Sequence, residues 1–191
     1  MRRLLLAAFL AVAPLVAAVL FAPSQAAAQP AAIGGPFRLT DQDGKPFSSD
    51  DLKGRPFALF FGFTHCPDIC PTTLFQLSED LKELGVEGER LQAVFVSVDP
   101  ERDRPEDLAV YLQSFDPRMK GLTGTLAEVD AAARAYKAFY KKVPLTGEGY
   151  AIEHTAVVYL MDAKGGFFSA LNAQEPPETR RAKLLRLARE G

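Results

Sequence analysis

Two nearly unbroken apolar stretches, residues 56–63 and 91–98, stand out in the hydrophobic pattern of the chain. Runs of this length that are rich in Phe and Val are typical of strands buried on both faces of a central sheet. Residues 152–161 contain a third strong strand by the same pattern. From Pro71 onward the apolar residues instead recur at helical spacing, and Gly85 marks the stop of that helix. The pattern therefore predicts buried strands together with amphipathic helices.

Shorter signals fill the intervals between these segments. They predict, in chain order, a β-hairpin that begins at residue 37 and ends near Phe47, a helical turn at 48–53, a helix at 105–115, a short strand at 120–124, a helix at 126–139, a loop at 146–149, a strand at 167–171 that pairs with the preceding strand, and a terminal helix at 176–188. Strands that alternate with helices and close on a β-hairpin and a helix indicate an α/β fold.

The composition indicates one globular domain. The chain has 191 residues, of which 48% are hydrophobic and 24% are charged, and this is enough apolar material for one substantial core. The formal net charge is −2, and no basic stripe stands out along the chain. Nucleic acid is therefore not an expected partner.

The first 28 residues differ in character from the rest. They have two arginines directly after Met1, continue with an apolar run over residues 4–22, and end in small residues that include Ala26 and Ala28. A positive start, an apolar middle and a small-residue end are typical of an export signal, and the run also approaches the length that spans a bilayer. We expect residues 1–28 to be an export signal or a membrane anchor, 29–35 a linker, and 36–191 the folded domain. Both alternatives predict a location in the periplasm or on the extracytoplasmic face of the inner membrane, where disulfides are tolerated.

The only two cysteines, Cys66 and Cys70, lie between the first long strand and the helix that starts near Pro71. A cysteine pair at the junction of the first main strand and its helix is the arrangement of thioredoxin. We therefore expect a thioredoxin-like fold with a central mixed sheet, helices on both faces and an N-terminal β-hairpin. The partial positive charge at a helix N-terminus favours the thiolate, which is both a nucleophile and a soft metal ligand.

Four interpretations of this cysteine pair are open. A static disulfide would close a very small loop and add little stability. A dithiol oxidoreductase usually has two residues between its cysteines, whereas three intervene here. A one-cysteine peroxidase would have a threonine three residues before the cysteine, but Thr64 is only two before Cys66. The fourth interpretation is a metal site, because two soft sulfurs favour Cu(I) or zinc.

The chain has only two histidines to complete a metal site, His65 and His154. A closed zinc site needs four ligands and would have to use both of them with both cysteines. That site would be strained, because His65 is adjacent to Cys66. Two cysteines and the distant His154 would give a three-ligand site, which copper accepts. His154 is predicted at the start of a strand. In a thioredoxin-like sheet, the loop that leads into this strand faces the loop that carries the cysteines.

Three stretches follow one another along the chain, at residues 61–71 (FGFTHCPDICP), 96–103 (VSVDPERD) and 153–162 (EHTAVVYLMD). Together and in this order they resemble the corresponding stretches of the Sco/SenC family, and the resemblance covers residues from about 35 to the C-terminus. The family consists of thioredoxin-fold copper proteins that help to assemble the binuclear copper centre of cytochrome c oxidase. The resemblance implies that residues 36–191 form a copper-binding domain. It implies that Cys66, Cys70 and His154 are the ligands of Cu(I) or Cu(II).

The resemblance implies a metallochaperone that delivers copper to cytochrome c oxidase subunit II, with another periplasmic copper chaperone as a further candidate partner. Two alternatives stay open. The protein is a thiol-disulfide reductase of that centre's cysteines, with Cys66 and Cys70 as its redox pair, or it is a redox or copper sensor. Enzymatic activity is expected only in the reductase case.

Neighbouring residues receive simpler predictions. Asp68 is expected to set the loop and to satisfy the start of the helix. Asp99 either supports the site from the next strand or simply ends that strand. Phe60, Phe61 and Phe63 are expected in the core rather than on a docking surface.

Overall fold

A computed structural model describes residues 32–191, and the predictions for residues 1–28 and for residues 29–31 of the linker lie outside them. Its strands are β1 (Arg38–Asp41), β2 (Pro46–Ser48), β3 (Phe57–Gly62), β4 (Gln92–Ser97), β5 (Lys120–Thr123), β6 (Tyr140–Pro144), β7 (Tyr150–His154), β8 (Val157–Met161) and β9 (Phe167–Asn172). Its helices are the 3-10 helix η1 (Ser49–Leu52), α1 (Ile69–Glu83), α2 (Val86–Glu89), α3 (Pro105–Leu112), α4 (Leu126–Ala135) and α5 (Pro177–Glu190). Within residues 32–191, no helix combines the length and the apolar character that crossing a bilayer requires.

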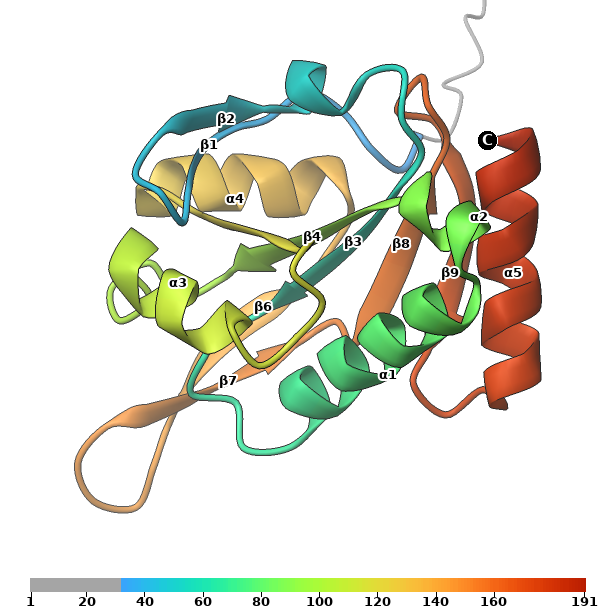
Figure 1. Cartoon of the computed structure of the whole chain (residues 1–191). Helices are drawn as coiled ribbons and strands as arrows, with labels where there is room; N and C mark the ends of the chain where they lie inside the picture. The colour runs from blue at the N-terminus through green and yellow to red at the C-terminus, as the bar shows by residue number, and fades with distance from the viewer. Residues whose placement is uncertain (1–31) are drawn as a thin grey trace, which may run out of the picture. The chain divides into compact units, whose positions relative to one another are not determined.

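Strand β3 lies near the middle of a seven-stranded mixed sheet with the order β2-β1-β5-β4-β3-β8-β9 (Figure 1). It pairs in parallel with β4 and antiparallel with β8, and all six of its residues are buried. The apolar run over residues 56–63 is therefore explained, because a strand covered on both faces has no polar side. The N-terminal β-hairpin is also present, since β1 pairs antiparallel with β2.

Aromatic contacts show that helices cover both faces of this sheet. The ring of Phe60 packs on Phe95, which contacts Tyr111 of α3. Phe61 points to the opposite face, as successive strand residues do, and packs on Tyr136 at the end of α4. The predicted α/β fold with a mixed sheet, helices on both faces and an N-terminal hairpin is confirmed.

The predicted helix over residues 126–139 is too long. Helix α4 ends at Ala135, because Lys137 adopts a left-handed backbone with φ of 54°. The amide of Lys137 then donates to the carbonyl of Arg134, and the amide of Ala138 donates to that of Ala133. This is the hydrogen-bond pattern of a Schellman motif, which usually has glycine at the left-handed position. A lysine at this position does not indicate a helix end, so neither the end of α4 nor the following strand β6 could be predicted from the sequence.

The single strand predicted within residues 152–161 is wrong as one element. The structure divides this stretch into β7, which pairs only with β6 in a separate two-stranded sheet, and β8, which belongs to the main sheet. His154 is consequently the last residue of β7 rather than the start of a long strand. Figure 1 shows the β6–β7 hairpin projecting from the rest of the domain.

Candidate metal site

The structure brings Cys66, Cys70 and His154 together, and one ligand atom of each lies within 4.8 Å of the others. The Nε2 atom of His154 is 3.3 Å from the Sγ atom of Cys70. The backbone amide of Cys70 donates to the Sγ atom of Cys66 at 3.4 Å. Both cysteines are free thiols. The three residues predicted from the sequence therefore lie at one site, although 84 positions separate Cys70 from His154.

Three different segments of the chain supply these side chains. Cys66 lies in the loop after β3, and Cys70 is in the first turn of α1, which starts at Ile69. The bond from the Cys70 amide to the Cys66 sulfur folds the loop back onto the start of α1, so the two cysteines lie close together. His154 comes from the projecting hairpin, where it pairs with Tyr140 of β6.

The ring of His154 is held in one orientation by its neighbours. Phe60 and Phe63 each contact it edge-on with ring centroids 5.8 Å apart, and both phenylalanines are buried as predicted. Its Nδ1 atom is 3.2 Å from the carbonyl oxygen of Thr155. Because a carbonyl can only accept, Nδ1 carries the proton of the neutral ring, and the lone pair of Nε2 faces Cys70. This is the tautomer that a metal ligand through Nε2 requires.

The cysteine loop is anchored by Asp103, a fully buried residue that sequence reasoning did not select. Its carboxylate accepts from the amide and the hydroxyl of Thr64, at 2.8 and 2.6 Å, and from the hydroxyl of Ser97 at 2.6 Å. The only available signal was its place in the stretch after β4. His65 lies 3.6 Å from the same carboxylate with more than half of its side chain exposed, and it is not among the three clustered ligands. The closed four-ligand zinc arrangement is therefore not formed.

Asp68 occupies the N-cap position of α1, but its side chain makes no capping hydrogen bond. One carboxylate oxygen instead accepts from the hydroxyl of Thr72 at 3.4 Å. The backbone satisfies part of the helix start, since the amide of Thr72 donates to the Asp68 carbonyl. The expectation that the Asp68 side chain caps this helix is wrong, although the residue does stand at its start.

Gly62, the last residue of β3, leaves the space that the Cys70 sulfur occupies. A methyl group added there would lie 2.9 Å from the Sγ atom of Cys70 and 2.8 Å from the ring of Phe95. Real side chains essentially never approach so closely, so one of these groups would have to move. The glycine thus allows the sulfur to pack against the sheet.

We expect Gly62→Ala to lower the free energy of unfolding by about 1–3 kcal/mol through overpacking and to weaken metal binding, because Cys70 is displaced. Gly121→Ala in β5 is the matched control, since its new methyl group would lie 2.5 Å from Leu112, outside the cluster. Urea unfolding and metal titration of both variants provide the measurement. Equal metal affinity in the two variants would show that Gly62 does not shape the site.

The two thiols have opposite acidities. The hydrogen bond from the Cys70 thiol lowers the pKa of Cys66 to about 4, and bonds from the backbone amides of Cys70 and Asp68 lower it further. The same hydrogen bond, together with burial, raises the pKa of Cys70 far above its usual range. Cys66 is therefore a thiolate at neutral pH, whereas Cys70 holds its proton.

We expect alkylation of Cys66 by iodoacetamide to keep nearly the same rate from pH 8 to pH 5, and to fall only as the pH approaches the Cys66 pKa of about 4. An ordinary thiol with a pKa near 8.5 would slow about tenfold for each pH unit below that value. Mass spectrometry of the cysteine peptide gives the rate, and urea-unfolded protein is the control. A tenfold fall per unit in the folded protein would contradict the prediction.

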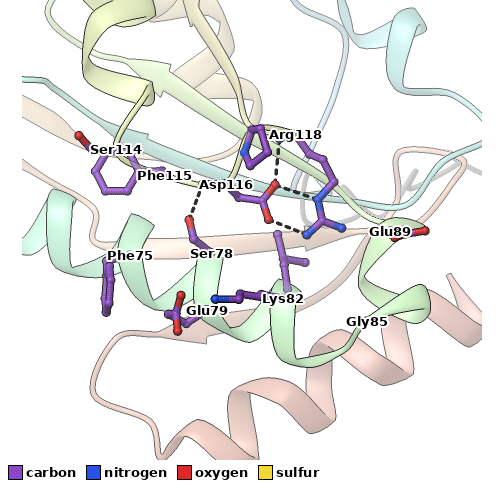
Figure 2. A pocket seen from close by; sticks show the side chains of 12 residues that line it. Phe75, Ser78, Glu79, Lys82, Gly85, Glu89, Ser114, Phe115, Asp116 and Arg118 are labelled. Atoms are coloured by element: carbon purple, nitrogen blue, oxygen red, sulfur yellow. Dashed lines mark hydrogen bonds and ion pairs between the residues drawn. The ribbon is translucent and has the colours of Figure 1, made fainter.

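A cleft of about 490 Å³ lies elsewhere on the domain, between α1 and residues 114–118 (Figure 2). Figure 2 shows Asp116 paired with Arg118 and bound through its amide to the hydroxyl of Ser78. None of the three clustered ligands lines this cleft. The candidate metal site is therefore a separate arrangement at the cysteine loop.

Comparison with known proteins agrees with the geometry of the site. A family model described as SCO1/SenC matches residues 25–189, a range that contains both cysteines and His154. The mitochondrial protein SCO2 of Saccharomyces cerevisiae is 42% identical over 143 residues, which are 73% of this chain and 48% of that protein. The chain thus spans about half the length of this relative.

Two solved structures extend the comparison to the fold. Copper-bound ScoI of Bradyrhizobium japonicum is 49% identical, with a TM-score of 0.76 over 82% of this chain and 99% of that one. BsSco, described as having a disulfide switch and as a member of the Sco family of cytochrome c oxidase assembly proteins, is 27% identical, with a TM-score of 0.66 over 85% and 98% of the two chains. The thioredoxin-like fold expected from the cysteine position is confirmed by these likenesses.

Proposed function

This chain belongs to the SCO1/SenC family, and from that membership and its Cys-Cys-His cluster we propose that it is a copper metallochaperone of cytochrome c oxidase assembly. Cys66, Cys70 and His154 bind the copper ion that the protein carries. The recipient is the binuclear copper centre of subunit II. The observation that carries the proposal is the convergence of these three ligand atoms within 4.8 Å.

The donor set fits copper. Thiolate sulfur is a soft ligand that favours Cu(I), and imidazole nitrogen suits copper in both of its common oxidation states. Cys66 is already ionised at neutral pH, and the lone pair of the His154 Nε2 atom faces the sulfurs. Only the Cys70 proton has to leave when the ion binds.

Three ligands also suit release. Copper accepts a further ligand, so a thiolate of the recipient can bind before any ligand of this protein leaves. His154 sits on the projecting β6–β7 hairpin, which pairs with no strand of the main sheet. The protein ligands then depart one at a time as recipient thiolates replace them, and copper is never free in solution.

The proposed location is the extracytoplasmic side of the inner membrane. It rests on the composition of residues 1–28, which is typical of an export signal or a membrane anchor. Residues 36–191 are the copper-binding domain in this proposal. A second copper chaperone in the same compartment is the proposed source of the ion.

A second candidate function is reduction of the recipient's cysteines, and the acidity of Cys66 favours it. A thiolate with a lowered pKa attacks a disulfide at neutral pH and forms a mixed disulfide, which the second cysteine then resolves. The recipient gains two thiols, and this protein ends with a Cys66–Cys70 disulfide. The free thiols of both cysteines are the state from which this reaction starts.

One anaerobic experiment with two arms separates these functions. Copper-loaded protein is mixed with the reduced, metal-free copper domain of subunit II, and metal-free protein is mixed with the same domain in its disulfide form. We expect copper to move in the first arm, as measured by metal analysis of the separated proteins. Thiol formation in the second arm without copper movement in the first would overturn the chaperone function in favour of the reductase.

A further inference from the structure

The hairpin that carries His154 is not held by the hydrogen bonds of the main sheet. Strands β6 and β7 pair only with each other, from Tyr140 opposite His154 to Pro144 opposite Tyr150. An isolated two-stranded hairpin is marginally stable in water. Ile152 is buried and anchors the middle of β7. Other contacts must fix how this strand lies relative to the cysteines.

Tyr150, the first residue of β7, makes three contacts with the loop after β4, through its hydroxyl, its carbonyl oxygen and its ring. Its hydroxyl donates to the Oδ1 atom of Asp99 at 2.7 Å. Its carbonyl oxygen accepts from the Nη1 atom of Arg102 at 3.2 Å. The guanidinium of Arg102 also lies 3.9 Å from the centre of the Tyr150 ring, well within cation–π range.

Asp99 and Arg102 are themselves fixed to the sheet. Asp99 is fully buried, its amide donates to the hydroxyl of Ser97 at the end of β4, and its carboxylate accepts from the Nε atom of Arg102. A buried carboxylate must be paired, so this ion pair is retained in the folded protein. The more exposed pair of Lys142 and Glu101, with 2.6 Å between its atoms, adds a weaker second link between hairpin and loop.

Arg102 also reaches toward the cysteine side. Its guanidinium carbon lies 6.0 Å from the ring centre of Phe63, and Phe63 packs edge-on against His154. Tyr150 and His154 are four positions apart on one strand, so their side chains lie on the same face. One arginine therefore contacts the hairpin at Tyr150 and approaches the residue that orients the imidazole.

We propose that Asp99, Arg102 and Tyr150 form a clamp that positions His154 over the cysteine pair. The inference rests on the proposed function, since it concerns the ligand geometry of the same site. The three are positioning residues and do not touch the metal. Metal ligands must be held to within about 0.5 Å of their binding geometry. The clamp holds β7 at Tyr150, at the end of the strand opposite His154, and thereby limits the tilt of the strand over the cysteine pair.

The test compares Arg102→Ala with Arg104→Ala. Arg104 is a neighbouring arginine whose partners, Glu106 and Asp107, lie on α3 and not on the hairpin. We expect Arg102→Ala to weaken Cu(I) binding about 10–100-fold in an anaerobic competition titration, the usual cost of removing an outer partner of a metal ligand. Arg104→Ala should bind as wild type does.

Two further measurements separate positioning from general stability. The electron paramagnetic resonance spectrum of bound Cu(II) should change in Arg102→Ala, and the His154 ring signals of the metal-free variant should broaden in NMR spectra. Tyr150→Phe, which removes one hydroxyl and keeps the ring beside Arg102, should show the same changes in smaller measure, and Arg102→Lys should restore part of the affinity.

The outcomes distinguish this inference from the function on which it rests. Wild-type protein that binds no copper would overturn the proposed function and the clamp together. Wild-type binding with unchanged affinity and spectra in both Arg102→Ala and Tyr150→Phe would overturn the clamp alone. Lower affinity in Arg102→Ala with a wild-type Cu(II) spectrum would also overturn it, because the ligand geometry would then be intact.

Discussion

Replacement of His154 by alanine should weaken copper binding by more than about 100-fold. Loss of a residue that only hydrogen-bonds to a metal ligand already lowers metal affinity about 10–100-fold, and the loss of a ligand should cost more. His154 is the one proposed ligand that the hairpin supplies, and its Nε2 atom is 3.3 Å from the Cys70 sulfur. The fold should survive the change, since the ring is only partly buried and its contacts with Phe60 and Phe63 are edge contacts. Anaerobic titration against a coloured Cu(I) chelator measures the affinity.

His65→Ala is the matched control for this prediction. It removes the only other histidine of the chain, which is adjacent to Cys66 in sequence. The side chain of His65 lies outside the ligand cluster. Its copper affinity should equal that of wild type. The assignment of the ligands would be wrong if His65→Ala lost copper and His154→Ala kept it.

Replacement of Arg180 by alanine should lower the free energy of unfolding by about 3–5 kcal/mol, the usual effect of leaving one partner of a buried ion pair uncompensated. The Nε atom of Arg180 on α5 donates to Asp80 on α1 at 2.7 Å, and both side chains are more than 90% buried. This pair joins the terminal helix to the helix that carries Cys70, and the two helices lie side by side in Figure 1. Urea unfolding of the metal-free protein provides the measurement.

Arg189→Ala is the control on the same helix. Arg189 pairs with Glu87 at 3.1 Å, but the arginine is largely exposed, so its loss should cost at most about 1 kcal/mol. A double variant, Asp80→Leu with Arg180→Met, should recover much of the stability, because apolar side chains of similar volume replace buried ion pairs well. Equal stability losses in Arg180→Ala and Arg189→Ala would show that burial does not decide the strength of the pair.

The main strands and the first long helix could be predicted because their signals are local. Residues 57–62 are apolar without interruption since both of their faces are covered, and the helix after the cysteines repeats leucine at helical spacing. The positions that failed carry no such local signal. Lys137 ends α4 in a backbone conformation that usually calls for glycine, and residues 140–144 form a strand only because residues 150–154 lie opposite them.

The polar residues that hold the site were harder to recognise than its ligands. Asp103 anchors the cysteine loop through Thr64, 39 positions away, and Asp99 holds the hairpin through Tyr150, 51 positions away. Nothing in the local sequence distinguishes such an aspartate from one that simply ends a strand. For Asp99, which allowed both roles, the structure shows a buried carboxylate that binds the hairpin.

The sequence by itself determined the candidate chemistry of this protein: two cysteines lie at the start of a helix, and one of the two histidines, His65, is adjacent to Cys66 and would strain a closed zinc site. Residue types and short spacings are enough for that conclusion, because ligand softness and helix-end charge are local properties. Only the tertiary structure decided that Cys66 is the acidic thiol and that His154 comes from a separate hairpin. Both outcomes depend on hydrogen bonds and packing between segments far apart in the chain, and such contacts leave no periodic pattern in the sequence.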